Sequence, residues 1–196
     1  MATTYLFDLD DTLINNKVYA AVYPAIKVLI QKKFSLNELQ FEEKAESLGM
    51  QKNKYGRFDS GDLCRKLGLT EEYYKILKEH IETIPVLKEY VHETFEKIKK
   101  SGKRIGIVSN SFHRTIMLYL EKYHLQHFIT LIFSAEDAGC KKSNSEFWKK
   151  LIQKEKLNPK ECLVIGDNEI EDKEVPERLS FKTFLIANEN DLKRVF

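Results

Sequence analysis

Five short apolar segments are spaced along the chain, and each is almost continuous rather than alternating in polarity. Strands that are buried on both faces have this pattern, because a parallel sheet is covered by helices on either side. The five segments are Tyr5–Phe7, Arg104–Val108, Leu131–Phe133, Cys162–Ile165 and Thr183–Ile186. We therefore expect a mostly parallel sheet in which each segment contributes one strand.

Most of the intervals between these segments carry apolar residues at helical spacing. Residues 86–98 place an apolar stripe on one helix face and are followed by Gly102, a common residue at helix ends. Residues 116–123 indicate a second helix and residues 147–152 a third. Strands that alternate with helices predict an open, doubly wound α/β sheet.

The interval between the first and second predicted strands is an exception, because it is far longer than a βαβ crossover of about 30 residues. Its apolar positions predict helices over residues 18–30, 36–48, 62–67 and 71–81, with glycines between several of them. We interpret residues 15–84 as a small helical domain that is inserted into a core made of residues 1–14 and 85–196.

The chain has 196 residues and a formal net charge of +2, since 32 basic side chains nearly balance 30 acidic ones. This balance gives no electrostatic footprint for a nucleic acid partner. The three cysteines do not have the spacing of metal ligands, and reduced thiols are typical of cytoplasmic proteins. We find no signal-peptide pattern and no apolar stretch long enough for a bilayer, so we expect a cytoplasmic protein without a membrane partner.

Three carboxylates directly follow the first predicted strand, in the sequence Asp8-Leu9-Asp10-Asp11-Thr12. Ligands of open α/β sheets bind beyond the carboxyl ends of the strands, so Asp8 and Asp10 should lie at the active edge. A carboxylate can attack phosphorus, and a second carboxyl group can protonate the leaving oxygen and then activate water. Clustered carboxylates also favour a hard divalent cation. The pattern indicates phosphoryl transfer with Asp8 as the nucleophile, and a solvated acidic loop is the alternative.

This segment resembles the first signature of the haloacid dehalogenase-like hydrolase superfamily, in its phosphatase branch. Three further segments match the family's motifs in the expected order, so the resemblance covers essentially the whole chain. It implies a Rossmann-like core, a helical cap inserted after the first strand and an aspartyl-phosphate intermediate. For most members of the family it also implies Mg²⁺ as the cofactor.

The second and third matching segments follow later strands. By resemblance, Ser109 and Asn110 bind the transferring phosphoryl group, whereas ordinary helix capping is the alternative for both. The family usually has Lys-Pro-Asp at the third position. Aligning this pattern places the catalytic lysine at Lys142, with serine and asparagine in place of the proline and aspartate, and with Lys141 as the alternative.

The fourth matching segment is a buried strand that runs into a group of acids. Asp167 can reach a cation that it shares with Asp8. By resemblance, the Mg²⁺ ligands are the Asp8 carboxylate, the backbone carbonyl of Asp10 and Asp167. Asp172 matches the second acid of this motif and would support the site, and Glu171 would take its place if the turn were shorter.

Together these residues predict a Mg²⁺-dependent phosphatase that acts on a small phosphorylated metabolite, such as a nucleotide, a sugar phosphate or a phosphoglycolate-like ester. Asp10 argues against a dehalogenase, because a halide leaves without a proton. A phosphomutase uses the same two aspartates and stays an alternative, as do dehalogenase-type or carbon–phosphorus cleavage and a non-catalytic phosphate-binding domain. The complete set of Asp8, Asp10, Lys142 and Asp167 disfavours the binding domain.

Two groups of residues in the insert could contact a substrate. Tyr19, Tyr23 and Lys27 share one helical face. The second group is a basic and aromatic loop that contains Lys52, Lys54, Tyr55, Arg57 and Phe58. Packing of the aromatic rings within the insert and solvation of the cations is the simpler interpretation.

Overall fold

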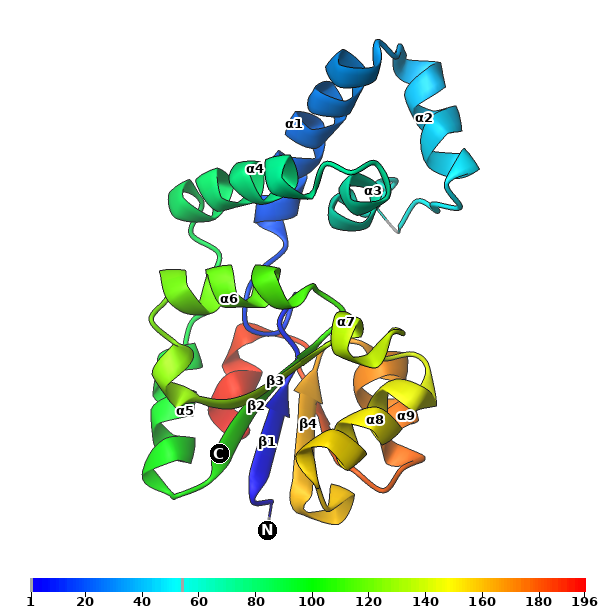
Figure 1. The fold of residues 1–196 in the computed structure, drawn as a ribbon. Helices are drawn as coiled ribbons and strands as arrows, with labels where there is room; N and C mark the ends of the chain where they lie inside the picture. Colours follow the sequence, from blue (N-terminus) through cyan, green and yellow to red (C-terminus); the bar gives the residue numbers. More distant parts are fainter. Residues whose placement is uncertain (1, 54) are drawn as a thin grey trace. The chain divides into compact units, whose positions relative to one another are not determined.

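The computed structural model describes residues 2–53 and 55–196. The chain folds into two compact units (Figure 1). One unit combines the segment up to Asn15 with Leu87–Phe196, and the other consists of Asn16–Val86. The assignment of residues 1–14 and 85–196 as a catalytic core, and of residues 15–84 as its cap, stays a prediction.

The larger unit contains a parallel sheet with the strand order β3–β2–β1–β4–β5. Its strands are β1 (Thr4–Phe7), β2 (Arg104–Ser109), β3 (Ile129–Ser134), β4 (Cys162–Gly166) and β5 (Lys182–Leu185). The chain builds outward from β1 to β3 on one side and continues with β4 and β5 on the other. The winding direction therefore changes between β1 and β4, and the predicted doubly wound α/β sheet is confirmed.

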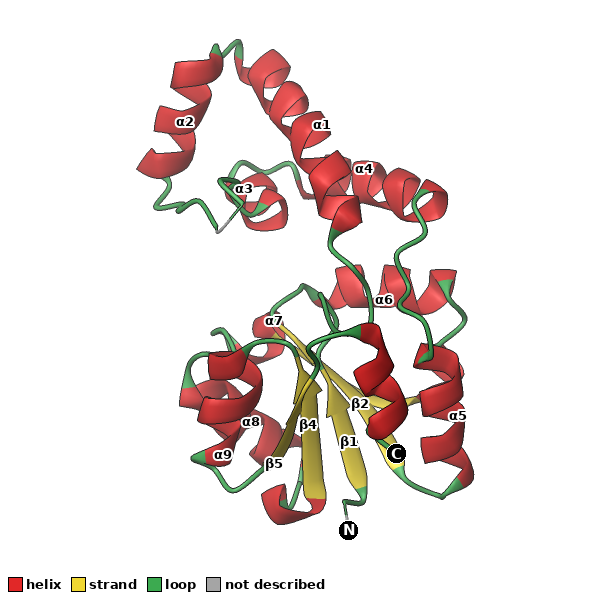
Figure 2. Cartoon of the chain, turned by 180° about the vertical axis from the view of Figure 1, so that it is seen from behind, coloured by secondary structure: helices red, strands yellow, loops and turns green. Residues whose placement is uncertain are grey.

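Helices cover both faces of this sheet. Figure 2 shows α5 on one side of the strands, and α8 and α9 on the other. The helices of this unit are α5 (Val91–Lys100), α6 (His113–Lys122), α7 (Ala135–Ala138), α8 (Ser145–Glu155) and α9 (Val175–Glu177). Short 3₁₀ turns lie at Gln126–Phe128, Pro159–Glu161 and Glu189–Arg194, and a π-helical turn lies at Glu169–Glu174.

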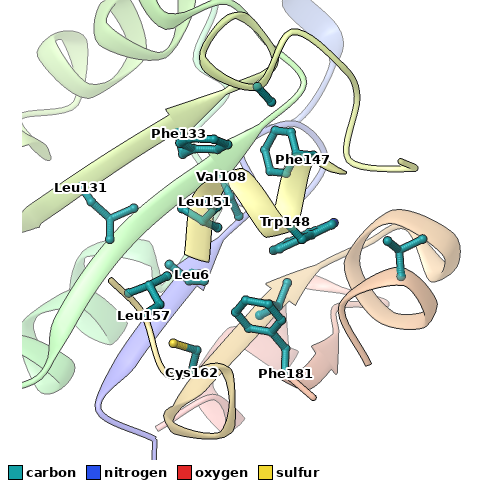
Figure 3. Close-up of a cluster of buried hydrophobic side chains, with 13 residues drawn as sticks. Leu6, Val108, Leu131, Phe133, Phe147, Trp148, Leu151, Leu157, Cys162 and Phe181 are labelled. Carbon is teal, nitrogen blue, oxygen red and sulfur yellow. The ribbon is translucent and has the colours of Figure 1, made fainter. Parts of the chain in front are cut away.

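Adjacent residues of β1 enter the two halves of the core, which explains why the strand is continuously apolar. Leu6 belongs to a buried cluster that includes Trp148 of α8 and Phe181 before β5 (Figure 3). Phe7 lies on the opposite face, and its ring centroid is 5.0 Å from that of Phe95 in α5. Each large apolar side chain buried in this way stabilises the fold by about 1.5–3 kcal/mol.

The helix predicted over residues 86–98 begins only at Val91, so the predicted start is wrong. Leu87 instead forms an antiparallel bridge with Ile14, and the N–H of Lys88 donates to the carbonyl of Leu13 at 2.9 Å. Tyr90 then adopts a left-handed conformation, with φ of 69°, directly before the first helical residue. Backbone pairing with the chain after β1 therefore replaces the first helical turn that the apolar spacing suggested.

The smaller unit contains the helices α1 (Lys17–Phe34), α2 (Glu38–Ser47), α3 (Ser60–Lys66) and α4 (Thr70–Thr83). One stripe of α1 is buried, and its apolar members are Val18, Val22, Ile26 and Ile30. Asn37 begins α2 with a capping box, in which its side chain and that of Gln40 each accept a backbone N–H of the other residue. None of the helices in the described ranges combines the length with the apolar character that a bilayer crossing requires.

Asp137 links α7 to α8 and so supports the loop between them, which carries Lys142. Its carboxylate accepts the backbone N–H of Ser134 at 2.9 Å and the ammonium of Lys154 at 2.7 Å. Partial burial raises the pKa of Asp137, but the bonds from Lys154 and Ser134 outweigh it and hold this pKa at about 2. The carboxylate therefore stabilises the fold above an unfolded-state pKa of about 3.9, and this contribution is lost as the pH falls toward 2.

We expect Asp137→Asn to lower the free energy of unfolding by about 1 kcal/mol at pH 7, because the helix cap and the ion pair are both weakened. The difference from the wild type should shrink as the pH falls from about 4 to about 2. Urea denaturation followed by circular dichroism at several pH values measures it. Glu96→Gln is the control, because Glu96 pairs with Lys100 on an exposed helix face. This substitution should change stability by about 0.5 kcal/mol or less at every pH. A difference that is constant with pH would contradict this account of Asp137.

Candidate active site

The carboxyl ends of β1, β2 and β4 lie next to one another, because these strands are neighbours in a parallel sheet. Asp8 follows β1, Asn110 follows β2 and Asp167 follows β4. The N–H of Asp8 donates to the carbonyl of Ile165 at 2.8 Å, which continues the pairing of β1 with β4 by one residue. Residues that are far apart in the sequence thus meet where the winding direction changes.

Lys142 brings a buried positive charge to this edge. Its side chain is only 2% exposed, and its ammonium donates to Asp8 Oδ1 and, at 2.7 Å, to Asp172 Oδ1. The backbone of the lysine is held as well, because its carbonyl accepts the indole N–H of Trp148 at 2.9 Å. Lys141 is exposed, so Lys142 is the member of this lysine pair that contacts Asp8.

Asp172 is fully buried and lies directly against Gly166. A Cβ atom added at Gly166 would lie 2.1 Å from Cγ of Asp172, which is an impossible contact. Glycine at the end of β4 therefore makes room for the Asp172 carboxylate beneath the ammonium of Lys142.

The π-helical turn selects Asp172 rather than Glu171 for this position. Asn168 caps the turn, since its Oδ1 accepts the N–H groups of Ile170 and Glu171 at 3.1 and 3.0 Å. The carbonyl of Asn168 accepts the N–H of Asp172 at 2.8 Å. A π turn is wider than an α turn, and such turns are frequent at functional sites. The carboxylate that meets Lys142 consequently comes from the later of the two acids.

Asp8 and Lys142 change each other's pKa through their opposite charges. Burial raises the pKa of Asp8 well above its usual value, Lys142 opposes this, and the carboxylates of Asp172 and Asp10 raise the pKa further. Burial lowers the pKa of Lys142, but the carboxylates of Asp8 and Asp172 outweigh burial and raise it. Lys142 therefore remains a cation. Buried ion pairs add little net stability, and perturbed groups of this kind concentrate at functional sites.

A cluster of carboxylate oxygens at this edge fits a hard divalent cation. Asp8, Asp167 and Asp172 each contribute one oxygen, and these atoms all lie within 4.8 Å of one another. Partial desolvation, and then the charge of Asp172, raise the pKa of Asp167. Both oxygens of Asp172 already accept hydrogen bonds, from Lys142 at 2.7 Å and from the N–H of Asn168 at 3.1 Å. The oxygen ligands that Mg²⁺ prefers are therefore best supplied by Asp8 and Asp167.

The side chain of Asp10 is not part of this carboxylate cluster and has a different partner. Its Oδ2 accepts the hydroxyl of Ser111 at 2.7 Å, which ties the loop after β1 to the loop after β2. Asp11 follows with φ of 58°, a left-handed conformation that aspartate tolerates better than most residues. The carboxyl group of Asp10 is thus oriented by a hydroxyl, whereas that of Asp8 is oriented by an ammonium.

Ser109 and Asn110 both take part in holding the loops of the site. Ser109 is buried, and its hydroxyl accepts the N–H of Ser111 at 3.0 Å. The Asn110 carbonyl oxygen accepts the backbone N–H of Lys142 at 2.9 Å, and its amide N–H donates to Glu171 at 2.7 Å. One amide hydrogen of Asn110 is therefore committed to Glu171, and the second is the one that could address a phosphoryl oxygen.

Sequence reasoning did not predict the contacts of Ser111 with Asp10 or of Trp148 with Lys142, and it considered Glu171 only as an alternative to Asp172. The local sequence carries no signal for the polar contacts of Ser111 and Trp148, because these contacts depend on loops that meet in three dimensions. The acidic run after β4 did contain a signal for Glu171, as an alternative to Asp172. Its actual partner, Asn110, could not be read from that run.

In the insert, most of the candidate substrate contacts are occupied within the unit. Lys27 pairs with Glu38, and Lys52 pairs with Glu42 at 2.7 Å. The Arg57 guanidinium lies 5.2 Å from the centre of the Tyr55 ring. The Tyr55 hydroxyl accepts the side-chain amide N–H of Asn16 at 2.8 Å. Phe58 is buried. Lys54 lies outside the described residues. These contacts favour the packing interpretation of the basic and aromatic loop.

The sequence matches the family described as Haloacid dehalogenase-like hydrolase over residues 5–186. This range includes every residue of the site above, and the chain therefore belongs to this family of hydrolases.

Individual proteins resemble this chain in sequence or in fold. Pyrophosphatase PpaX of Bacillus thuringiensis (strain Al Hakam) is 26% identical over 167 residues, which are 84% of this chain and 74% of the relative. A HAD phosphatase from Thermococcus onnurineus has a similar crystal structure, with a TM-score of 0.75 and 19% identity over 95% of this chain and 86% of that one. The HAD-hydrolase YfnB from Bacillus subtilis, solved bound to magnesium, has a TM-score of 0.62 and 18% identity over 94% of this chain and 86% of that one. At these identities the two structures establish a shared fold.

Proposed function

We propose that this chain is a Mg²⁺-dependent phosphatase that hydrolyses a small phosphorylated molecule through an aspartyl-phosphate on Asp8. The observation that carries the proposal is the buried arrangement of Asp8, Lys142 and Asp172, in which one ammonium bridges two carboxylates. An ammonium at this position steadies the nucleophile and can neutralise an incoming phosphoryl group. A protein that only bound phosphate would not need a carboxylate at the centre of its site.

The reaction takes place in two steps. An oxygen of Asp8 attacks phosphorus while the bond to the leaving oxygen breaks, and Asp10 gives its proton to that oxygen. Water then attacks the phosphorus of the aspartyl-phosphate, Asp10 takes a proton from the water, and phosphate and the free Asp8 carboxylate are released. Ser111 orients Asp10 for both proton transfers. Ser109 and Asn110 line the phosphoryl position at the end of β2.

Mg²⁺ held by Asp8 and Asp167, with the Asp10 backbone carbonyl as a further ligand, would supply positive charge to the phosphoryl oxygens. In this arrangement Asp172 supports the site by binding Lys142 rather than the cation. The contact in which the Ser111 hydroxyl donates to the Asp10 carboxylate also favours hydrolysis of an oxygen ester over dehalogenation, because the leaving oxygen of an ester requires a proton and a halide does not.

Inorganic pyrophosphate is a second candidate substrate, because the relatives at 26% identity are named as pyrophosphatases. Phosphate is a better leaving group than an alcohol, so its departure depends less on proton donation. Loss of the Asp10 proton should therefore slow the hydrolysis of sugar phosphates more than that of pyrophosphate. The two candidate substrate classes can be separated by this difference.

The proposal is tested by measuring phosphate release from a panel of compounds, with added Mg²⁺ and with excess EDTA. The panel comprises p-nitrophenyl phosphate, sugar phosphates, nucleotides, phosphoglycolate and pyrophosphate, with 2-chloropropionate as a halide-releasing control. We expect release from at least one phosphate compound, a loss of about 100-fold or more in EDTA, and recovery when Mg²⁺ is restored. Halide release, or transfer of phosphate to a second sugar without free phosphate, would replace this proposal with the dehalogenase or the mutase alternative.

A further inference from the structure

The side-chain amide of Asn110 lies between a carboxylate and a backbone N–H. Its Nδ2 donates to Glu171 Oε2 at 2.7 Å, and its Oδ1 accepts the N–H of Lys142 at 2.9 Å. Both partners admit only one orientation of the amide, because a carboxylate cannot donate and an N–H cannot accept. A flipped amide would place oxygen against oxygen and nitrogen against nitrogen. Glu171 therefore fixes which end of Asn110 faces Lys142.

These contacts form part of a closed circuit. Asn110 holds the backbone of Lys142, the ammonium of Lys142 donates to Asp172, and Asp172 is adjacent in the chain to Glu171, which returns to Asn110. The circuit joins the loop after β2, the segment before α8 and the π turn after β4. Its members restrain one another, so a change in Glu171 is transmitted to the lysine that contacts Asp8.

The sign of the charge on Glu171 makes this placement informative. Glu171 is half-buried and is the chain neighbour of Asp172. Its carboxylate accepts from Asn110, and it therefore stands beside the position proposed for an anionic phosphoryl group. A further negative charge there weakens anion binding by Coulomb repulsion. The charge of Glu171 opposes the binding of an anion, while its hydrogen bond fixes the orientation of Asn110. A role in positioning Asn110 therefore explains Glu171 better than a role in recognising the phosphate.

We propose that Glu171 is a positioning residue, which acts through Asn110 to keep Lys142 in contact with Asp8. The inference rests on the proposed function, because it assigns Glu171 to the same reaction. Small misplacements of a charge-stabilising group lower the rate of the chemical step strongly. Loss of Glu171 therefore affects kcat more than KM, whereas a residue that contacts the substrate directly would change KM.

The test compares Glu171→Ala with Glu171→Gln on the substrate with the highest activity. We expect Glu171→Ala to lower kcat about tenfold, which is the effect of losing one charge-assisted hydrogen bond, with KM changed by about twofold or less. Glu171→Gln keeps an oxygen acceptor for Asn110 and should retain at least about half of the wild-type kcat. If Glu171→Ala does not fold, Glu171→Asp takes its place, because the shorter side chain cannot maintain the contact.

Glu169→Ala is the matched control. It removes the same charge from the same turn, but Glu169 is exposed and pairs with Lys173 at 3.0 Å, so kcat should stay within about twofold of the wild type. The proposal is overturned if Glu171→Ala behaves like this control, or if Glu171→Gln is as impaired as Glu171→Ala.

A spectroscopic measurement tests the contact without using activity. The Asn110 side-chain amide signal in a ¹⁵N–¹H spectrum, identified with Asn110→Asp, should lie downfield because one proton is bonded to a carboxylate. It should move to the position of solvent-exposed asparagines in Glu171→Ala and stay in place in Glu169→Ala. An unmoved signal in Glu171→Ala overturns the proposal. If the wild type releases no phosphate from any compound, the proposed function fails, while this measurement still reports on the contact.

Discussion

Asp8→Asn is expected to abolish phosphate release, with a loss of at least about 10⁴-fold in kcat. An amide has nearly the same shape as the carboxylate, so the side chain can occupy the same space. It is a far weaker nucleophile, and it cannot form the aspartyl-phosphate. Steady-state phosphate release and mass spectrometry of the acid-quenched protein measure the two effects together.

The same substitution should not destabilise the metal-free protein. Burial raises the folded-state pKa of Asp8, so this group contributes stability below its unfolded-state pKa, where it is protonated, and the contribution is lost as the pH rises through the folded-state pKa and the carboxyl group ionises. At pH 7 in EDTA, replacing this carboxylate with a neutral amide should leave the melting temperature unchanged or higher. Inactivity combined with a retained fold would separate a chemical defect from a structural one.

Two neighbouring carboxylates provide controls for Asp8→Asn. Asp11→Asn makes the same chemical change in the same loop, at a position with φ of 58° that asparagine also tolerates, and activity should remain within about threefold. Asp10→Asn should lower the turnover of alkyl phosphates by about 10²–10⁴-fold but still allow Asp8 to be phosphorylated. An active Asp8→Asn enzyme, or equal losses in Asp8→Asn and Asp11→Asn, would remove Asp8 from the nucleophile position.

The edge at which the site lies could be predicted from local patterns. Continuous apolar segments identified the strands, and Asp8 and Asp167 directly follow two of them. In a parallel sheet, residues at the carboxyl ends of neighbouring strands must come together, whatever the loops do. The sequence therefore indicated a common edge for these two residues without any knowledge of the turn geometry.

Contacts that depend on loop conformation could not be predicted in the same way. Whether Asp172 or Glu171 meets Lys142 is decided by the π turn and by the space above Gly166. The contacts of Glu171 with Asn110 and of Ser111 with Asp10 join loops that follow different strands. Neither contact leaves a periodic or spacing signal in the chain.

Residues 86–90 show a different limit of pattern reasoning. Apolar positions there continued the helical stripe of α5, but the backbone of Leu87 and Lys88 pairs with the chain after β1 instead. Long-range pairing can override local spacing, since an apolar residue is buried equally well in an extended segment.

Lys142→Met is expected to lower both activity and stability, because it removes the counter-charge of two buried carboxylates. Removing one charged partner from the transition state costs about 10²–10³-fold in kcat. Removing one member of a buried ion pair costs about 3–5 kcal/mol of folding free energy, since the remaining charge stays uncompensated. Phosphate release and urea denaturation in EDTA measure the two losses.

The stability loss should depend on pH in a defined direction. Without Lys142, the folded-state pKa of Asp8 rises further above its unfolded-state value of about 3.9, because the opposing positive charge is gone. Such a group supports folding at low pH and opposes it as the pH rises through the raised pKa. The destabilisation should therefore be larger at pH 8 than at pH 5, where the Asp8 carboxyl group can take up a proton more readily.

Lys141→Met is the matched control, because it makes the same change at the adjacent, exposed lysine. It should alter stability by about 0.5 kcal/mol or less and kcat by about twofold or less. Asp8→Asn combined with Lys142→Met should be more stable than Lys142→Met alone, because one of the two stranded carboxylates is removed. If the double variant is less stable than both single variants at pH 8, the ion pair is not the source of the loss. If Lys142→Met and Lys141→Met are equally active, the lysine that stabilises the phosphoryl group has been assigned wrongly.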